Sequence, residues 1–447
     1  MNGTPRPQDV STKLLRIAKL AREDPQRALT TLAHHIDVEF LREAYRRTRK
    51  DGATGVDHQT AEDYASNLES NLRSLLDRFK AGTYQAPPVR RVHIPKGDGK
   101  KTRPIGIPTF EDKLLQRAVA MVLEAIYETE FYFFSFGFRP QRGAHDALEY
   151  LWKELMMMGG GWVLEVDIKG FFDTLDHGQL RRFLDQRVRD GVLRRTIDKW
   201  LKAGVLEDGA LSRPEEGTPQ GGVVSPILAN VYLHVVLDRW FESEVKPRLR
   251  GKAFVVRYAD DFVIVLEHES DARKVHEVLP KRFGKYGLTL HPEKTQLVRF
   301  YRPTKASAGK GRDEQGGTPG GFDLLGFSHF WQRSRKGNWV VRRKTAPTRF
   351  QRAIKRIDEW CRVNCHLPIK EQQEHLSRKL QGHYGYYGIT GNSVALSRFS
   401  YWVNHVWRRW LNRRSQRARM FWDKFKRLLQ RYPLPPPKCI HSKLVTK

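Results

Sequence analysis

A pair of adjacent aspartates between two apolar runs constrains this chain more than any other feature. Residues 254–266 read Phe-Val-Val-Arg-Tyr-Ala-Asp-Asp-Phe-Val-Ile-Val-Leu, so β-branched residues flank Asp260 and Asp261 on both sides. Such runs predict two short buried strands that meet in a tight hairpin. Two carboxylates at its tip repel each other, and the apolar surroundings penalise their charge further. A divalent cation would resolve this conflict, because Mg²⁺ binds carboxylate oxygens together with phosphates and water.

A second acidic strand end supplies a partner for this pair. Residues 162–176 read Trp-Val-Leu-Glu-Val-Asp-Ile-Lys-Gly-Phe-Phe-Asp-Thr-Leu-Asp, and the strand expected over 162–166 ends at Asp167. Three carboxylates suit two metal ions roughly 3.5–4 Å apart, which could activate an attacking hydroxyl and stabilise a leaving pyrophosphate. An isolated Asp-Asp pair is more often a solvated turn. The apolar flanks and the second acidic strand favour phosphoryl transfer here.

With these two segments the chain resembles the group II intron-type reverse transcriptases, the intron-encoded maturases of bacteria and organelles, over roughly residues 50–410. The resemblance implies an α+β fold of the right-hand polymerase type, with fingers and palm around antiparallel sheet and an α-helical thumb/maturase domain. The implied parts are a helical N-terminal extension (1–49), fingers (50–161), palm with an insertion of the fingers (162–331), thumb/maturase (332–432) and a Pro-rich basic tail (433–447).

The same resemblance implies the catalytic residues and their metal. Asp167, Asp260 and Asp261 would be catalytic, with two Mg²⁺ ions as the cofactor and Mn²⁺ as a substitute. The implied metal ligands are these three aspartates and Ile168.

A basic hairpin is the first candidate for binding a nucleotide. Residues 89–108 form two extended segments around a Lys-Gly-Asp-Gly-Lys-Lys turn, which predicts a β-hairpin with cations at its tip. Lysine and arginine on such a finger can neutralise a triphosphate, although an isolated loop of this kind is often only solvated. By resemblance, Lys96 and Arg103 contact the triphosphate.

Two further nucleotide contacts follow from the resemblance. Phe172 occupies the position where reverse transcriptases place a bulky side chain against the sugar, which selects dNTP over rNTP. Phe171 could take that place instead, or fill the core. Residues 216–230 begin as a Gly- and Pro-rich loop, whose glycines let the backbone approach a ligand, and continue as a buried helix. Gln220 in the Pro-Gln-Gly sequence of this loop would line the dNTP pocket.

An excess of positive charge indicates a polyanionic partner. The 80 lysines and arginines against 50 aspartates and glutamates give a formal net charge of +30, which favours nucleic acid held through phosphate contacts. The expected partners are group II intron RNA or another RNA template, a DNA primer or target DNA, and dNTPs. Candidate nucleic-acid contacts are Arg139 and Arg142, Lys294 near the catalytic centre, and, on the C-terminal helices, Arg408, Arg409, Arg413 and Arg414.

The C-terminal region predicts helices with a mixed aromatic and basic surface. In residues 402–411 the 3.6-residue period places one set of apolar side chains on a single face, which is expected to be core rather than a platform for bases. That set is Val403, Val406, Trp407, Trp410 and Leu411.

Three cysteines suit a reducing compartment and are too few for the Cys/His-rich DNA endonuclease of larger relatives, so cleavage of a second DNA strand is not expected. Cys361, Cys365 and Cys439 are expected to be buried thiols on a helix rather than zinc ligands. No signal peptide opens the chain, and the uncharged run 217–237 is interrupted by proline and glycine, so no membrane contact is expected. A bacterial cytoplasmic protein associated with nucleoid or ribonucleoprotein fits these features.

Three functions are compatible with the sequence. The first is an RNA-directed DNA polymerase that binds its intron RNA and assists splicing and mobility. The second is a related polymerase in defence, a retron-like element or DNA repair, without an intron. The third is a non-catalytic RNA chaperone, which would not require the catalytic aspartates or the nucleotide contacts.

Overall fold

The computed structural model describes residues 8–95, 102–207, 210–212, 217, 221–303, 320–414 and 419–441. The chain divides into two compact units, the first formed by residues 1–151 with 164–297 and the second by residues 152–163 with 298–447. Most of the sequence-predicted fingers (50–161) and most of the predicted palm (162–331) therefore fall in the first unit. The predicted thumb/maturase region falls in the second.

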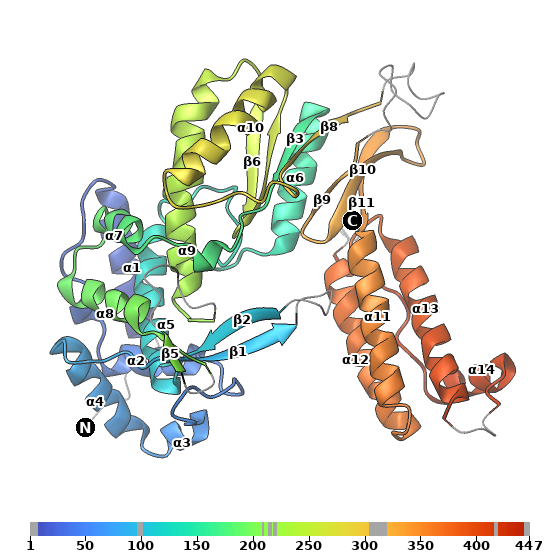
Figure 1. Cartoon of the computed structure of the whole chain (residues 1–447), viewed down its shortest axis with the longest axis horizontal. Helices are drawn as coiled ribbons and strands as arrows, with labels where there is room; N and C mark the ends of the chain where they lie inside the picture. Colours follow the sequence, from blue (N-terminus) through green and yellow to red (C-terminus); the bar gives the residue numbers. More distant parts are fainter. Residues whose placement is uncertain are drawn as a thin grey trace. The chain divides into compact units, whose positions relative to one another are not determined.

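Helices form much of the N-terminal part of the first unit (Figure 1). Helix α2 begins after Asp37, whose carboxylate accepts the backbone N–H of Phe40 at 2.9 Å, and such a cap satisfies a donor that the helix leaves free. Helix α5 is buried along most of its length, and α1 and α2 pack against it. These helices are α1 (Gln8–Glu23), α2 (Val38–Arg47), α3 (Ala61–Ala65), α4 (Leu68–Lys80) and α5 (Phe110–Tyr127).

The predicted basic hairpin is confirmed. Strands β1 (Val89–Pro95) and β2 (Thr102–Ile107) pair antiparallel from Arg90 opposite Ile107 to Pro95 opposite Thr102. The tip between them lies outside the described residues. Strands β4 (Val205–Glu207) and β5 (Ala210–Ser212) complete a sheet of order β2-β1-β4-β5.

The two acidic segments lie in one sheet, as the sequence predicts. Its strand order is β6-β7-β3-β8, so the strand before Asp167 neighbours the hairpin that carries Asp260 and Asp261. Within the uncharged run 217–237, helix α9 is buried in the protein, and α10 covers β7. The elements are β3 (Gly160–Val166), β6 (Ala253–Tyr258), β7 (Asp261–Leu266), β8 (Gln296–Tyr301), α6 (Ala144–Met158), α7 (His177–Asp185), α8 (Gly191–Lys202), α9 (Ser225–Leu233) and α10 (Glu269–Gly284).

The second unit combines a three-stranded sheet of order β11-β10-β9 with a helical bundle, in which α11 and α12 both pack against α13 (Figure 1). The face predicted for residues 402–411 is confirmed: Val403, Val406, Trp407 and Leu411 are buried, and Trp410 packs partly buried beside them. The elements are β9 (Phe322–Leu324), β10 (Phe327–Arg333), β11 (Trp339–Thr345), α11 (Pro347–Val363), α12 (Ile369–Tyr387), α13 (Ser393–Asn412) and α14 (Trp422–Arg431).

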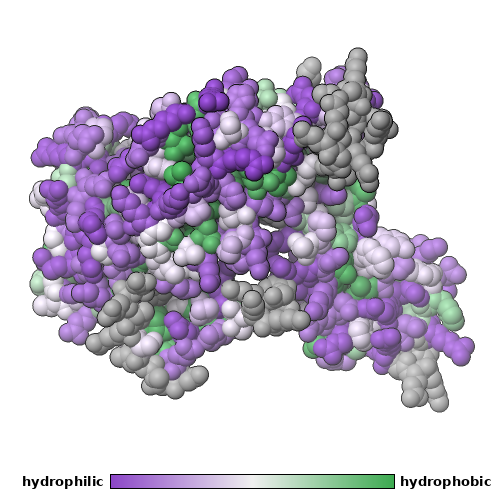
Figure 2. Space-filling view, turned by 45° about the horizontal axis from the view of Figure 1, so that its top comes forward, coloured by the Kyte–Doolittle hydropathy of each residue, from purple (hydrophilic) through white to green (hydrophobic). Residues whose placement is uncertain are grey.

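The cysteines only partly match the expectation. Cys361 is buried on α11, but the expectation of buried helical thiols is wrong for Cys365 and Cys439. Both are partly exposed and lie outside helices, since α11 has already ended at Val363 and Cys439 follows the end of α14. Within the described part of the chain, no helix is long and apolar enough to cross a membrane. Hydrophilic residues cover most of the face shown in Figure 2, as the charged composition requires.

Candidate polymerase active site

The Tyr-Ala-Asp-Asp sequence forms a two-residue hairpin turn. Tyr258 and Asp261 pair across β6 and β7, which leaves Ala259 and Asp260 as the two central residues. Ala259 has φ = 58°, and Asp260 has a negative φ, a pattern typical of the type II′ turns that suit the twist of a hairpin. A non-glycine residue in the left-handed region costs free energy, so neighbouring structure must hold this turn in place.

Asp167 follows β3 directly and is held by the segment after α10. The backbone carbonyl of Asp167 accepts the N–H of His291 at 2.8 Å, and Ile168 pairs with Leu290 in an antiparallel bridge. Asp167 Oδ2 accepts a hydrogen bond from Lys294 Nζ at 2.7 Å. Lys294 therefore lies beside Asp167. The side chain of Ile168 is a hydrocarbon without a donor atom, so only its backbone carbonyl could contribute a metal ligand.

The electrostatics of the turn indicate that Asp167 and Asp260 are neighbours. Burial raises the pKa of Asp260, and the negative charge of Asp167 raises it further, while Arg103 and Arg257 act in the opposite direction. Asp261 stands at the exposed start of β7. Among the described residues, no group of three His, Cys, Asp or Glu side chains is arranged to hold a metal ion as it stands. In this arrangement Asp167 is paired with Lys294.

A buried charge pair lies directly beneath the turn. Arg257 and Asp238 are both 0% exposed, and the guanidinium donates to the two carboxylate oxygens at 2.8 and 2.5 Å. The same guanidinium donates to Asn230 Oδ1 at 2.9 Å and to the carbonyl of Ala259 at 3.2 Å. Arg257 therefore links α9 and the helical segment after it to the catalytic turn.

Glycine is required where a second segment meets this turn. A Cβ atom built on Gly137 would lie 2.2 Å from the backbone nitrogen of Ala259, far inside van der Waals contact. The carbonyl of Gly137 accepts a hydrogen bond from Asn230 Nδ2 at 2.8 Å, and the neighbouring Phe136 N–H donates to the carbonyl of Arg257 at 2.8 Å. Residues 134–137 thus form a backbone support for Arg257 and Ala259.

Three residues of this support were not predicted from the sequence: Gly137, Asn230 and Asp238. A signal for the charge pair was present, because Asp238 directly follows the uncharged run 217–237 and Arg257 lies within an apolar strand segment, where an unpaired charge would be costly. For Gly137 the signal is weaker: it stands between Phe136 and Phe138, where a glycine can permit close approach of backbones.

Of the predicted nucleotide contacts, two can be placed. Arg103 lies on β2 and is exposed, yet its charge acts on Asp260. Phe172 is partly exposed, whereas Phe171 is 3% exposed and packs against Tyr232. The structure therefore assigns Phe171 to the core and leaves Phe172 available to a ligand. Lys96 and Gln220 lie outside the described residues.

Gly217 and Gly221, which lie before and after Gln220, contact the segments that carry Phe172 and Arg103. Gly217 packs against the backbone of Phe172, since a Cβ there would lie 2.9 Å from the Phe172 carbonyl oxygen. Gly221 packs against β2, where a Cβ would lie 2.4 Å from the carbonyl oxygen of Gly106. The Pro-Gln-Gly sequence is therefore bounded by glycines that touch the strand of Arg103 and the segment of Phe172.

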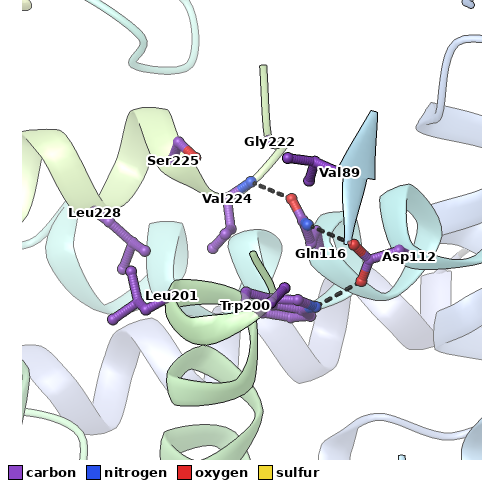
Figure 3. Close-up of a pocket in the computed structure, with 10 residues that line it drawn as sticks. Val89, Asp112, Gln116, Trp200, Leu201, Gly222, Val224, Ser225 and Leu228 are labelled. Atoms are coloured by element: carbon purple, nitrogen blue, oxygen red, sulfur yellow. Dashed lines mark hydrogen bonds between the residues drawn. The ribbon is translucent and has the colours of Figure 1, made fainter. Parts of the chain in front are cut away.

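A small cavity lies under the start of α9. Its volume of about 20 Å³ is enough for one water molecule. Figure 3 shows Gln116 linking the backbone N–H of Val224 to Asp112, which also accepts from Trp200 Nε1 at 2.6 Å. Burial raises the pKa of Asp112 to about 6. This cluster is a structural support, because its polar groups are used within the fold.

Several predicted nucleic-acid contacts have partners within the protein. Arg139 is 6% exposed, binds Glu128 through two nitrogens and donates to two backbone carbonyls, so it stabilises its own loop. Arg142 donates to the carbonyl of Phe133 at 2.6 Å but remains partly exposed. On the C-terminal helices, Arg408 donates to Met420, Arg409 pairs with Asp358, Arg413 lies over the Trp410 ring and Arg414 donates to His366.

Comparison with known proteins identifies two families along the chain. Residues 94–329 match the family described as reverse transcriptase (RNA-dependent DNA polymerase), and residues 350–429 match the group II intron, maturase-specific domain. The first match covers the acidic sheet and most of the β1–β2 hairpin. The second covers nearly all of the helical bundle. This succession confirms the right-hand polymerase fold with a maturase domain.

Individual relatives agree with the family matches. The group II intron-encoded protein LtrA of Lactococcus lactis subsp. cremoris is 36% identical over 303 residues, which cover 65% of this chain and 50% of LtrA. Protein YkfC of Escherichia coli is 34% identical over 290 residues, which cover 58% of this chain and 76% of YkfC. The chain thus spans about half the length of LtrA. It belongs to the reverse transcriptase (RNA-dependent DNA polymerase) family, among the group II intron reverse transcriptase/maturases.

Proposed function

We propose that this chain is an RNA-directed DNA polymerase that binds group II intron RNA and assists the intron's splicing and mobility. The observation that carries the proposal is the position of Asp167 beside the turn of Asp260 and Asp261, on neighbouring strands of a reverse transcriptase palm. The maturase-specific match over residues 350–429 favours an intron RNA over the partners of intron-free reverse transcriptases. Such a protein would act in a cytoplasmic ribonucleoprotein with the RNA, a DNA primer or target, and dNTPs.

The donor chemistry at the turn fits Mg²⁺ as the cofactor, with Mn²⁺ as a substitute. Burial and the neighbouring Asp167 disfavour the charge of Asp260, and a hard cation would compensate it through oxygen ligands. Asp167, Asp260 and Asp261, with the backbone of Ile168, would hold the metal. Two bound ions would activate the primer hydroxyl and neutralise charge on the leaving pyrophosphate.

The chain's own residues would orient the nucleotide and limit its identity. Arg103, with Lys96 and Gln220, would bind the incoming dNTP, because a guanidinium matches the geometry of phosphate oxygens. The ring of Phe172 would pack against the sugar and exclude a 2′-hydroxyl. Arg257 and Asp238 would keep the turn in position without touching the nucleotide. Arg142 and Lys294 would contact the template or primer from the same unit.

Primer extension on an RNA template tests the polymerase. Asp260→Asn should reduce DNA synthesis about a thousandfold, since losing a metal ligand removes several kcal/mol of transition-state stabilisation. RNA affinity should change little, because phosphate contacts are spread over many cations. Asp173→Asn, at an exposed aspartate in the same segment as Asp167, is the matched control. Extension at the wild-type rate by Asp260→Asn would show that the active-site assignment is wrong.

Splicing of a group II intron separates the two activities. Assisting a ribozyme requires RNA held in its active shape and no phosphoryl transfer by the protein. Asp260→Asn should therefore support splicing at nearly the wild-type level while it fails to make DNA. A wild-type chain that extends primers but never stimulates splicing would favour the polymerase without an intron.

A further inference from the structure

Helix α13 carries aromatic side chains on the face opposite its core. Its buried residues pack inside the bundle, and a helix of this kind usually turns a polar face to the solvent. Instead, the Tyr401 side chain is 56% exposed and Trp402 is 45% exposed. Large exposed rings that gather on one surface indicate a binding site more often than chance exposure does.

These rings are continuous with the start of α14. The His405 ring centroid lies 4.1 Å from that of Tyr401 and 4.5 Å from that of Trp422. Trp402 lies 5.8 Å from Tyr401. Phe421, next to Trp422, is 65% exposed. We call Tyr401, Trp402, His405, Phe421 and Trp422 the aromatic surface.

Positive charge accompanies the aromatic surface. The guanidinium carbon of Arg408 lies 4.3 Å from the centroid of the Trp422 ring, in cation–π geometry. Arg398 is exposed one turn before Tyr401 and Trp402, and helix α13 contains no aspartate or glutamate. Burial, with the charge of Arg408, lowers the pKa of His405, so its ring is mostly neutral at pH 7. The ligand should therefore offer flat apolar faces together with negative charge.

Unpaired nucleotides combine these two properties. A base presents a π-face for stacking on tyrosine or tryptophan, and its phosphate suits a nearby guanidinium. Bases inside a duplex are stacked on their neighbours and cannot offer that face. We infer that the aromatic surface binds unpaired nucleotides of RNA by stacking. The inference rests on the proposed function, since it names the part of the RNA that this unit recognises.

Binding of two RNA probes to the full chain tests the inference. A single-stranded oligoadenylate and an RNA duplex of equal length are titrated across a range of salt concentrations. The double variant Tyr401→Ala/Trp402→Ala should bind the oligoadenylate about tenfold more weakly or worse, since each stacked ring contributes about 1–3 kcal/mol. Its salt dependence should stay unchanged, because no phosphate contact is lost. Duplex affinity should change less than about twofold.

Three controls accompany the double variant. Tyr401→Phe/Trp402→Phe retains both rings and should bind as the wild type does. Val394→Ala removes an exposed apolar side chain without a ring from the same helix and should also leave binding unchanged. Thermal unfolding of each variant should match that of the wild type, because the truncated side chains are exposed and lie outside the core.

Several outcomes would overturn the inference. One is an unchanged affinity of the double variant for oligoadenylate. Another is an equal loss of affinity for the single-stranded and the duplex probe, which would indicate that RNA binding is weakened in general. The wild-type chain could also self-associate through this surface while removal of the rings leaves RNA binding unaffected. That result would assign the surface to protein contacts instead. If the wild-type chain bound neither probe, the proposed RNA-binding function itself would fail.

Discussion

Gly137→Ala should impair DNA synthesis although residue 137 touches no substrate. The added Cβ would lie 2.2 Å from the backbone nitrogen of Ala259, whereas ordinary contact begins near 3.4 Å. The catalytic turn or its support must therefore move by roughly the difference of 1.2 Å between these distances. A misplacement of about 1 Å at reacting groups can reduce a rate about a hundredfold. Overpacking should also lower the free energy of unfolding by about 1–3 kcal/mol.

The assay is primer extension under single-turnover conditions, with RNA affinity and thermal unfolding measured on the same preparation. Gly143→Ala is the matched control, since it lies in the same segment and its Cβ would approach no atom closer than 3.6 Å. It should retain wild-type activity. Gly137→Ala protein that is folded, binds RNA and extends primers at the wild-type rate would refute the idea that this contact positions the turn.

Two other substitutions test sugar selection and stability in acid. Phe172→Ala should raise rNTP incorporation relative to dNTP, measured by competition between the two nucleotides. If Phe172→Ala keeps the selectivity for dNTP and Phe171→Ala loses it, the buried ring of Phe171 selects the sugar instead. Burial, with the charge of Arg343, lowers the pKa of His329 to about 3. The folded protein favours the neutral ring, whereas the unfolded chain binds a proton on His329 below pH 6.5. The free energy of unfolding should therefore fall by about 1.4 kcal/mol per pH unit between pH 6.5 and pH 3. His329→Phe can keep the stacking on Phe322. Its free energy of unfolding in urea should fall less steeply with decreasing pH than that of the wild type, and equal slopes for the two proteins would contradict this.

Local patterns predicted much of the fold and part of the site. Short apolar runs located β6, β7 and the strand before Asp167, and two extended segments around a Gly-rich turn located the β1–β2 hairpin, because strand and turn preferences act over a few neighbouring residues. The 3.6-residue period identified the core face of α13. Residue type alone could not decide which cations face solvent. Arg139 was expected to contact nucleic acid, but it binds Glu128 inside the protein. The two residues are eleven positions apart and meet only because the loop between them folds back, which the sequence pattern does not show.

The support of the turn escaped prediction for a related reason. Asn230 reaches the Gly137 carbonyl across 93 residues of sequence, and Asp238 meets Arg257 from a helical segment that has no motif of its own. Neither contact leaves a periodic trace, since each depends on how distant elements pack. A charge next to an apolar or uncharged run was the available signal, and such a charge indicates that a partner exists without identifying it.

Because the turn depends on these supporting contacts, the presence of the three aspartates alone does not show that a chain can synthesise DNA. Asp167, Asp260 and Asp261 would distinguish a polymerase from a non-catalytic RNA chaperone only if the turn that carries two of them is held in place. Ala259 adopts a left-handed conformation, and that strain persists only when surrounding contacts determine it. Gly137 and the Arg257–Asp238 pair supply those contacts, and removing one partner of such a buried pair costs about 3–5 kcal/mol. A relative could therefore keep all three aspartates and lose DNA synthesis through a change at Gly137 or Asp238, while its maturase helices still bind RNA.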